Sequence, residues 1–227
     1  MESNILTSLA TTMVFRQIEQ EQLARILALA LKRSLRKGEV ISWANEVFPY
    51  VLLVEKGFVD IMRESEKGGS LLLRRLRPVD VFWGHAIIDG GPTPGTLKAG
   101  KTNTTIYLWH HDHLVPFLKD NPRATWEVMR VLMKRMRQAS STIDELAFDD
   151  VLTRLARLIV KEYNTEGKQK RLSRTMTLEQ MAAMIGTSPE VVCRLLYRIS
   201  NKEIIEITRT QFVIKDLEQL KLLANEE

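Results

Sequence analysis

The sequence predicts an α+β protein in which an N-terminal antiparallel β-roll, a long helix and a C-terminal winged helix-turn-helix follow one another. Three observations support this prediction. Short β-rich runs fill residues 38–109, an apolar seam at helical spacing runs through 122–146, and residues 175–207 carry the capping signals of two helices joined by a tight turn. The predicted domains are the β-roll at 1–120, the long helix and hinge at 121–148, and the winged helix-turn-helix at 149–227.

The N-terminal half changes pattern near residue 38. Residues 17–35 carry apolar side chains at helical spacing and predict an amphipathic helix. From Gly38 to Trp109, runs such as YVLLVEKG and TTIYLW are separated by turn-forming residues. Gly57 lies between two of these runs, at a position typical of a hairpin turn. Many short strands at close spacing favour an antiparallel barrel or roll.

A long helix is predicted from 122 to 146, which is ~37 Å at 1.5 Å per residue. Its apolar residues alternate steps of three and four, which is the spacing of a coiled-coil seam. Such a stripe can pack on its own domain, but a narrow seam on so long a helix favours a second copy of the chain, and hence a homodimer. The predicted interface residues are Met129, Leu132, Met136, Ala139, Ile143 and Leu146. Asp149-Asp150 predicts a break before a further amphipathic helix over 151–163.

The stretch 175–207 predicts a helix-turn-helix. Thr177 is placed to cap the first helix in a capping box with Gln180, and Gly186 to end that helix with a positive φ. The second helix then begins with a Ser cap and a Pro at its first position, and Ala182, Val192 and Leu195 fall where the two helices pack together. Its exposed face is predicted to comprise Ser188, Pro189, Glu190, Cys193, Arg194, Tyr197 and Arg198. The alternative is an ordinary helical hairpin with a solvated charged face.

The segments around this motif complete the predicted domain. The polar run 164–174 predicts a loop or a short β element, and 203–207 with 212–215 predict a β-hairpin wing. The net charge of the chain is +5, and residues 151–215 contain 12 Lys and Arg against 6 Asp and Glu. The excess positive charge therefore surrounds the second helix, where a DNA backbone would use it.

Composition limits the other possibilities. No apolar run approaches the ~20 residues that span a bilayer, and the N-terminus lacks a signal-peptide pattern, so we expect a cytoplasmic protein with no membrane partner. The single cysteine, Cys193, excludes a disulfide within the chain and argues against an iron–sulfur cluster. We find no nucleophile–base pairing and no phosphate-cradling glycine loop, so we do not expect an enzyme.

The order of these elements resembles that of the bacterial transcription regulators of the cyclic-AMP receptor protein / fumarate–nitrate regulator (CRP/FNR) family, which have a helix, a β-roll, a long helix and a winged helix-turn-helix. The resemblance covers nearly the whole chain and is clearest in KGEVI (37–41), LLVEKGFVDI (52–61), LAFDDVLTRLARLI (146–159) and the helix-turn-helix. It implies a homodimer that binds a palindromic site in double-stranded DNA, with RNA polymerase as a partner and a small effector in a cyclic-nucleotide-binding-like β-roll.

The resemblance also implies which residues contact DNA. In this family a Glu and, four residues later, an Arg read a G·C pair, and Glu190 and Arg194 occupy those positions on one helical face. Pro189 stands where the family often has an Arg, and Cys193 where a small residue usually precedes the reading Arg. Further candidates for DNA contact are Thr177, Arg198, Lys202 and Arg209, and solvated surface charge is the alternative for the basic ones.

The effector region departs from the family pattern. Cyclic-nucleotide binders of this family have Gly-Glu after a strand and later an Arg-Ser/Thr-Ala segment, whereas this chain has Gly84-His85 and Thr93-Pro94-Gly95. The missing Arg removes a charge-assisted contact of about 1.5–3 kcal/mol to the cyclic phosphate. The family's Thr-Ser pair in the long helix reads Ala139-Ser140. We therefore expect an effector other than cyclic AMP, or none, at a pocket that includes Gly84, His85, Thr93 and Ser140.

Three alternatives concern the signal and the partner. His85 can serve as a haem ligand, although a buried, hydrogen-bonded histidine is the simpler expectation. Oxidation of Cys193 can disturb DNA binding, although a small filler beside the DNA is the simpler role. The winged helix can instead contact another protein. The run His110-His111-x-His113 is not predicted to bind metal, because adjacent residues on a strand point to opposite faces.

Overall fold

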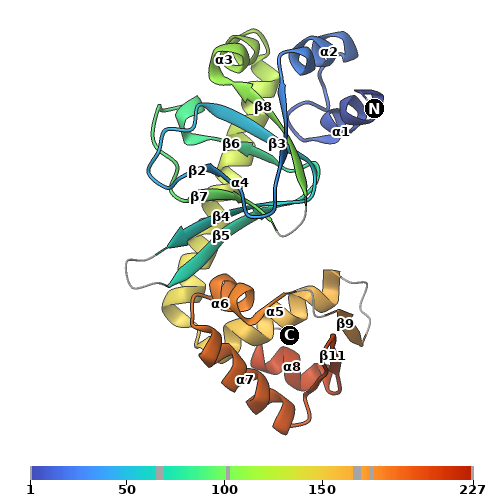
Figure 1. The fold of residues 1–227 in the computed structure, drawn as a ribbon, viewed down its shortest axis with the longest axis vertical. Coiled ribbons are helices and arrows are strands. Elements are labelled where there is room, and N and C mark those ends of the chain that lie inside the picture. The colour runs from blue at the N-terminus through green and yellow to red at the C-terminus, as the bar shows by residue number, and fades with distance from the viewer. Residues whose placement is uncertain (1, 65–68, 101–102, 166–169, 174–175, 226–227) are drawn as a thin grey trace. The chain divides into compact units, whose positions relative to one another are not determined.

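The computed structural model describes residues 2–64, 69–100, 103–165, 170–173 and 176–225. The chain divides into two compact units, of which the N-terminal unit comprises Met1–Arg63 and Leu73–Gln138 and the C-terminal unit comprises Glu64–Leu72 and Ala139–Glu227. Figure 1 shows the elements of each unit.

Eight strands of the β-roll form two four-stranded sheets, as the sequence predicted. The first sheet has the order β1-β8-β3-β6, and the second has the order β2-β7-β4-β5. The strands are β1 Leu31–Leu35, β2 Val40–Ser42, β3 Tyr50–Lys56, β4 Val59–Glu64, β5 Ser70–Leu76, β6 Val81–Trp83, β7 Thr96–Ala99 and β8 Thr104–His110. A short 3-10 helix, η1 (His85–Ile87), follows β6. Gly57 joins β3 to β4 with a φ of 76°, but the hairpin predicted there is wrong, because the two strands belong to different sheets.

Strand β3 contributes side chains to two separate apolar cores of the roll. Leu52 and Val54 belong to the core between the sheets, whereas Val51 and Leu53 belong to a second core under the helices. Both faces of β3 are therefore buried, which is why its sequence is a continuous apolar run and not an alternation. The helices that share the second core are α1 (Glu2–Thr11), α2 (Gln20–Ala28), α3 (His111–Asp120) and the first part of α4 (Pro122–Phe148).

The predicted helix over 17–35 is wrong in its second half. Helix α2 ends at Ala28, and Leu31–Leu35 is the strand β1, which pairs antiparallel with Thr104–Leu108 of β8. Local periodicity favoured a helix, but the pairing with a strand some seventy positions later decides the conformation. Helices α1 and α3 were not predicted from the sequence.

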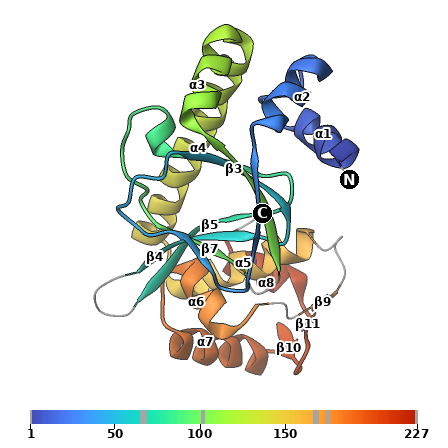
Figure 2. The ribbon, with the colours of Figure 1, turned by 45° about the horizontal axis from the view of Figure 1, so that its top comes forward.

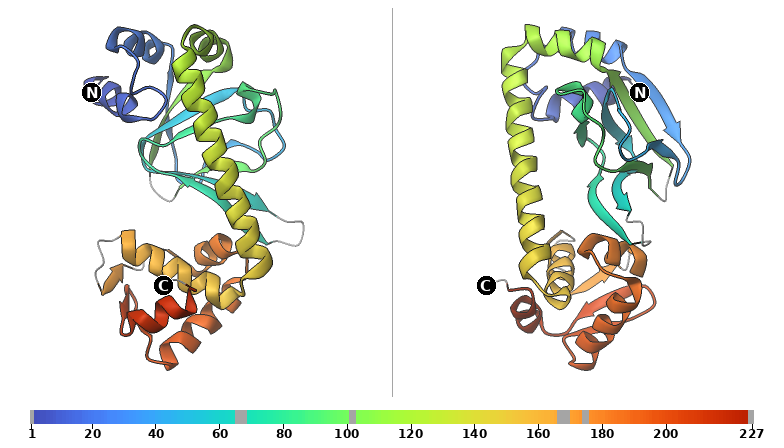
Figure 3. Two further views of the ribbon diagram at one scale, coloured as in Figure 1. Left: turned by 180° about the vertical axis from the view of Figure 1, so that it is seen from behind. Right: turned by 90° about the vertical axis from the view of Figure 1, so that its left-hand side faces the viewer.

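Helix α4 runs unbroken from Pro122 to Phe148 (Figure 3). Pro122 occupies its first position, where a missing N–H costs no hydrogen bond. The helix ends just before Asp149-Asp150, as predicted. Within the described ranges, the helices include none with the length and apolar character that crossing a bilayer requires.

The C-terminal unit is a winged helix-turn-helix built around one apolar core, with Leu155, Val192 and Leu220 fully buried. A three-stranded sheet of order β10-β11-β9 forms the wing. Helix α8 was not predicted, and β9 lies in the run predicted as a loop or short β element, of which residues 166–169 and 174 lie outside the described residues. The elements are α5 Val151–Thr165, β9 Arg171–Ser173, α6 Leu178–Ile185, α7 Pro189–Asn201, β10 Ile205–Ile207, β11 Gln211–Ile214 and α8 Leu217–Leu223.

Candidate nucleic-acid interface

Side-chain caps and one glycine fix the turn between α6 and α7. The Thr177 side chain accepts a hydrogen bond from the backbone N–H of Gln180 (3.3 Å), and the Gln180 side chain accepts one from the backbone N–H of Thr177 (3.0 Å). Gly186 ends α6 with a φ of 65°. This positive φ is what favours glycine here, since the nearest atom to an added Cβ would be Cδ2 of Leu146 at 2.8 Å, the movable end of a partly exposed side chain. The predicted capping box and glycine cap are confirmed.

Helix α7 begins as predicted and packs on α6 (Figure 2). The Ser188 hydroxyl accepts a hydrogen bond from the backbone N–H of Val191 (3.4 Å), and Pro189 is the first helical residue. Ala182 of α6 and Val192 and Leu195 of α7 are buried. Burying this face leaves the opposite face of α7 toward solvent.

That solvent face carries the predicted DNA-contacting side chains. Glu190, Arg194, Tyr197 and Arg198 are exposed, and Tyr197 retains 63% of its surface. Ser188, Pro189 and Cys193 are half-buried at its edges, Lys202 is the exposed C-cap of α7, and Arg209 is exposed in the turn between β10 and β11. Their contacts with bases or phosphates remain predictions.

The electrostatics of α7 favour an ionised Glu190. The side chain of Ser188 hydrogen-bonds the Glu190 carboxylate and, together with the backbone N–H of Glu190, holds the pKa of that carboxyl below its usual value. At neutral pH the carboxylate is therefore an acceptor, which is the form that pairs with the amino group of cytosine.

Arg154 of α5 joins the end of α4 to the end of α6 within the C-terminal unit. Its guanidinium donates to the backbone oxygens of Ile185 (2.9 Å, from Nε), Asp149 (2.6 Å) and Glu145 (3.4 Å, both from Nη1). The carbonyl of Ile185 lies in the last turn of α6, where no helical N–H is available to it, and the carbonyl of Asp149 directly follows α4, whereas the Glu145 carbonyl also accepts the backbone N–H of Asp149 at 3.1 Å. One side chain thus caps two helices and fixes the last turn of α4 to the helix-turn-helix.

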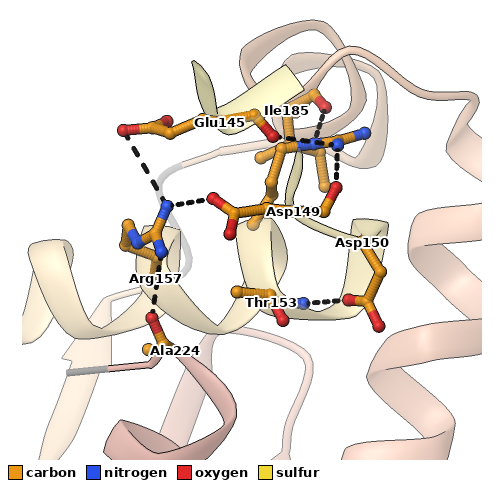
Figure 4. A network of polar contacts seen from close by, with 8 residues as sticks. Glu145, Asp149, Asp150, Thr153, Arg157, Ile185 and Ala224 are labelled. Atoms are coloured by element: carbon orange, nitrogen blue, oxygen red, sulfur yellow. Dashed lines mark hydrogen bonds and ion pairs between the residues drawn. The ribbon is translucent and has the colours of Figure 1, made fainter. Parts of the chain in front are cut away.

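Arg157 and the two aspartates strengthen this junction (Figure 4). Nη1 of Arg157 lies 2.6 Å from Oδ2 of Asp149, and its Nη2 donates to the Ala224 oxygen at 3.2 Å. Asp150 accepts from the backbone N–H of Thr153 at 2.7 Å and so caps α5, which lowers the pKa of Asp150. These contacts give Asp149-Asp150 a structural role at the hinge.

The Arg154→Met variant is expected to lower the free energy of unfolding by about 1–3 kcal/mol, because it removes the side-chain donor to the carbonyl oxygens of Ile185, at the end of α6, and Asp149, just after α4. Urea unfolding followed by far-UV circular dichroism measures this change. The matched control is Arg209→Met, which removes the same charge from an exposed turn and should change stability by less than about 0.5 kcal/mol. Equal losses in the two variants would contradict the role of Arg154.

The effector candidates in the N-terminal unit differ in burial and in hydrogen bonding. Gly84 is buried, and a Cβ there would lie 2.9 Å from the Tyr50 oxygen, which explains the glycine. Thr93 is buried, and its hydroxyl donates to the backbone oxygens of Trp43 (3.1 Å) and Glu46 (3.3 Å), so it holds that loop. His85 is exposed at the start of η1, so the expectation of a buried, hydrogen-bonded histidine is wrong. The strand before it buries Phe82 and leaves the following turn at the surface.

Exposed apolar side chains lie along α4, and they coincide with only some of the predicted interface positions. Met129, Met136 and Ile143 are 44%, 63% and 65% exposed, while Leu132 is half-buried against the core of its own unit. The stripe also includes Trp126 and Met133, which the sequence analysis missed. Their spacing of 126, 129, 133, 136, 140 and 143 also alternates threes and fours, so periodicity admits both seams, and the half-buried Leu132 is what favours the seam with Trp126 and Met133. Ala139, Ser140 and Leu146 are exposed on the same helix.

A groove of about 560 Å³ lies along this stripe, between Met13 and the side chains of Trp126, Met129 and Met133. Basic side chains of α4, Arg130, Lys134 and Arg137, form part of its lining. An exposed apolar groove of this kind is typical of an interaction surface.

The predicted divergence of His110 and His111 is wrong. His110 ends β8 and caps α3, whereas His111 is the first residue of α3, so strand alternation does not apply to the pair. The Asp112 carboxylate lies 3.1 Å from Nδ1 of His110 and 3.0 Å from Nε2 of His111. Among the described residues this is the one group whose donor atoms are close enough to hold a metal ion, and the carboxylate already joins the two imidazoles.

Comparisons with known proteins agree with this architecture. Residues 32–121 match the family of cyclic nucleotide-binding domains, and residues 153–223 match that of Crp-like helix-turn-helix domains. The chain is 25% identical over 216 residues to a CRP-like cAMP-activated global transcriptional regulator of Mycobacterium tuberculosis, covering 93% of this chain and 96% of that protein.

Solved structures share the fold. A mutant of CooA from Carboxydothermus hydrogenoformans superposes with a TM-score of 0.74 at 22% identity, over 88% of this chain and 90% of that one. The c-di-GMP responsive global regulator CLP of Xanthomonas campestris superposes with a TM-score of 0.75 at 17% identity, over 86% and 99%.

Proposed function

The chain belongs to the CRP/FNR family of transcription regulators, and we propose that it acts as a homodimer that binds a palindromic DNA site in response to a small effector other than cyclic AMP. The observation that carries this proposal is the exposed face of α7, on which Glu190 and Arg194 lie one helical turn apart while Val192 is fully buried.

Dimerisation follows from the apolar stripe on α4. Trp126, Met133, Met136 and Ile143 each leave at least half of their surface exposed along one helix, and exposure of this kind is costly in a monomer. Pairing the stripe with its copy around a two-fold axis buries it on both chains. The same axis relates the two α7 helices, which then read two half-sites about 34 Å apart in successive major grooves.

The effector proposal rests on the side chains available. The Mycobacterium tuberculosis relative is described as cAMP-activated, whereas this chain has His85 and Thr93-Pro94-Gly95 in place of the carboxylate and arginine that hold a cyclic nucleotide in the family. The Thr93 hydroxyl is moreover occupied by two backbone oxygens. We propose that the ligand acts by shifting the packing of α4, whose last turn Arg154 holds to the helix-turn-helix. RNA polymerase is the partner proposed for the DNA-bound dimer.

Selection from a random DNA pool, with and without cyclic AMP, tests this function. The expected product is a two-fold symmetric site with half-site centres about 10 base pairs apart. Affinity for it should fall steeply with salt and should be unchanged by cyclic AMP. Failure to enrich any sequence, together with salt-insensitive binding, would favour a winged helix that contacts protein. A rise in affinity with cyclic AMP would overturn the effector proposal alone.

A further inference from the structure

The N-terminal unit contains a cavity of about 300 Å³ whose lining includes Trp83, the residue before Gly84. It is bounded by the loop after α1 (Thr11–Val14), the turn between β5 and β6 (Pro78–Val81) and one turn of α4 (Val131–Arg135). Lys134 and Arg135 supply positive charge to its lining, and Asp80 is the acidic residue there.

Arg135 in the lining, and Arg74 beside Asp80 of the lining, lack the partners that buried guanidinium groups normally have. The side chain of Arg74 on β5 is only 20% exposed, and its nearest ion-pair partner is Asp80, at 3.9 Å. Within the part of the chain that the structure describes, buried Nη2 of Arg74 and buried Nε of Arg135 have no hydrogen-bond acceptor. Arg135 does donate from Nη1 to Gln138 at 2.9 Å.

The next residue in the same strand, Arg75, is an arginine whose guanidinium group has a full set of partners. Arg75 faces the other side of β5, donates from Nε and Nη2 to the two carboxylate oxygens of Asp60 at 2.7 and 2.9 Å, and stacks 4.2 Å from the centre of the Phe58 ring. The contrast indicates that the poor pairing of Arg74 is specific to the cavity side.

The charges at this place do not balance. Burial, and then the charge of Arg135, lower the pKa of Arg74 to about 10, and burial also lowers the pKa of Arg135. Both groups remain protonated at neutral pH. Within the described part of the chain, the guanidinium groups of Arg74 and Arg135 therefore share the carboxylate of Asp80, and the exposed Lys134 adds positive charge nearby. Buried charge without a counter-charge is strongly destabilising.

We propose that this place binds a small oxyanion, a phosphate or carboxylate group of the effector, between the guanidinium groups of Arg74 and Arg135. Planar guanidinium forks match the oxygens of such groups and form charge-assisted hydrogen bonds with them. Because Arg135 belongs to α4, the anion would join the β-roll to the helix that carries the dimer stripe. The regulatory meaning of the site rests on the function proposed above, whereas anion binding itself does not.

Thermal unfolding of the full-length protein tests the site without DNA. All four tryptophans, Trp43, Trp83, Trp109 and Trp126, lie in the N-terminal unit, so their fluorescence reports the unfolding of that unit. Sodium phosphate and sodium succinate are each compared with sodium chloride at equal ionic strength. We expect at least one of the two anions to raise the melting temperature saturably, by roughly 2–6 °C at ten times its dissociation constant. The two salts distinguish a phosphate from a carboxylate ligand.

Three variants test whether the rise in melting temperature depends on Arg74 and Arg135. Arg74→Met and Arg135→Met should abolish the rise and, in chloride, melt no lower than the parent, because each removes an uncompensated charge. Arg77→Met is the matched control, since Arg77 is exposed at the same end of β5 and its loss changes the net charge equally; it should keep the full rise. The proposal would be overturned if the anions raised the melting temperature equally in the parent and the three variants. It would also be overturned if neither anion raised the melting temperature of the parent above its value in chloride. The DNA selection described above is independent of both outcomes.

Discussion

The Arg194→Ala variant is expected to lose its preference for the palindromic site while it keeps weak, salt-sensitive binding to any duplex. The exposed guanidinium of Arg194 lies on the same face of α7 as Glu190, and a bidentate contact from arginine to guanine contributes about 1–3 kcal/mol of discrimination. Because a dimer loses one such contact in each half-site, specific affinity should fall roughly 30-fold to more than 10⁴-fold. Fluorescence anisotropy with the selected site and with a scrambled duplex, at two salt concentrations, measures both the specific affinity and the salt-sensitive non-specific affinity.

Lys202→Ala provides the comparison for a residue that is proposed to contact a DNA phosphate. Lys202 is exposed at the C-terminal end of α7, and a phosphate contact carries no sequence information. This variant should weaken binding to both duplexes by a similar factor and reduce the salt slope by about one. If Arg194→Ala behaves in the same way as Lys202→Ala, Arg194 contacts phosphate and does not read a base.

The Ile143→Glu variant is expected to separate the dimer. Ile143 is 65% exposed in the chain on its own, and in the proposed dimer a two-fold axis would bring two such carboxylates into an apolar seam. An unpaired buried charge costs about 3–5 kcal/mol, so the dimer dissociation constant should rise by at least roughly 100-fold. Sedimentation velocity across a concentration series measures the change, and affinity for the palindrome should fall with it.

Ser141→Glu is the matched control for the dimer prediction. Ser141 is exposed on the same helix but lies away from the apolar stripe, so the added charge should leave the dimer intact. Met133→Glu distinguishes the two possible seams, because Met133 is 50% exposed and belongs only to the stripe that includes Trp126. A dimer that tolerates glutamate at both 133 and 143 would contradict an interface along this face of α4.

The helix-turn-helix could be predicted almost residue by residue because its signals are local. The Thr177 cap with Gln180, the positive φ of Gly186 and the Ser188-Pro189 start all depend on neighbours within four positions. The buried and exposed faces of α7 followed from the same periodicity. Helix α8, by contrast, is short, and the Asp216 cap that begins it was not recognised.

Burial changed the account of the effector region. The sequence drew attention to His85 through its place after Gly84, but the structure leaves His85 at the surface and commits the Thr93 hydroxyl to backbone oxygens. Arg74 and Arg135 are 61 positions apart and carry no shared motif, so nothing in the sequence connects them. A basic residue on the inward face of β5 was the available signal, and it gains meaning only once the facing residue of α4 is known.

The sequence by itself determined the order of the elements, the turn chemistry and the exposed face of α7, because caps, glycine conformations and helical periodicity act over a few residues. Tertiary structure decided that Leu31–Leu35 is a strand, that Leu132 of α4 packs on its own unit, and that Arg74 and Arg135 both lie near Asp80. The physical reason is that strand pairing, burial and charge compensation depend on partners distant in the chain, and those partners are set only by the packed fold.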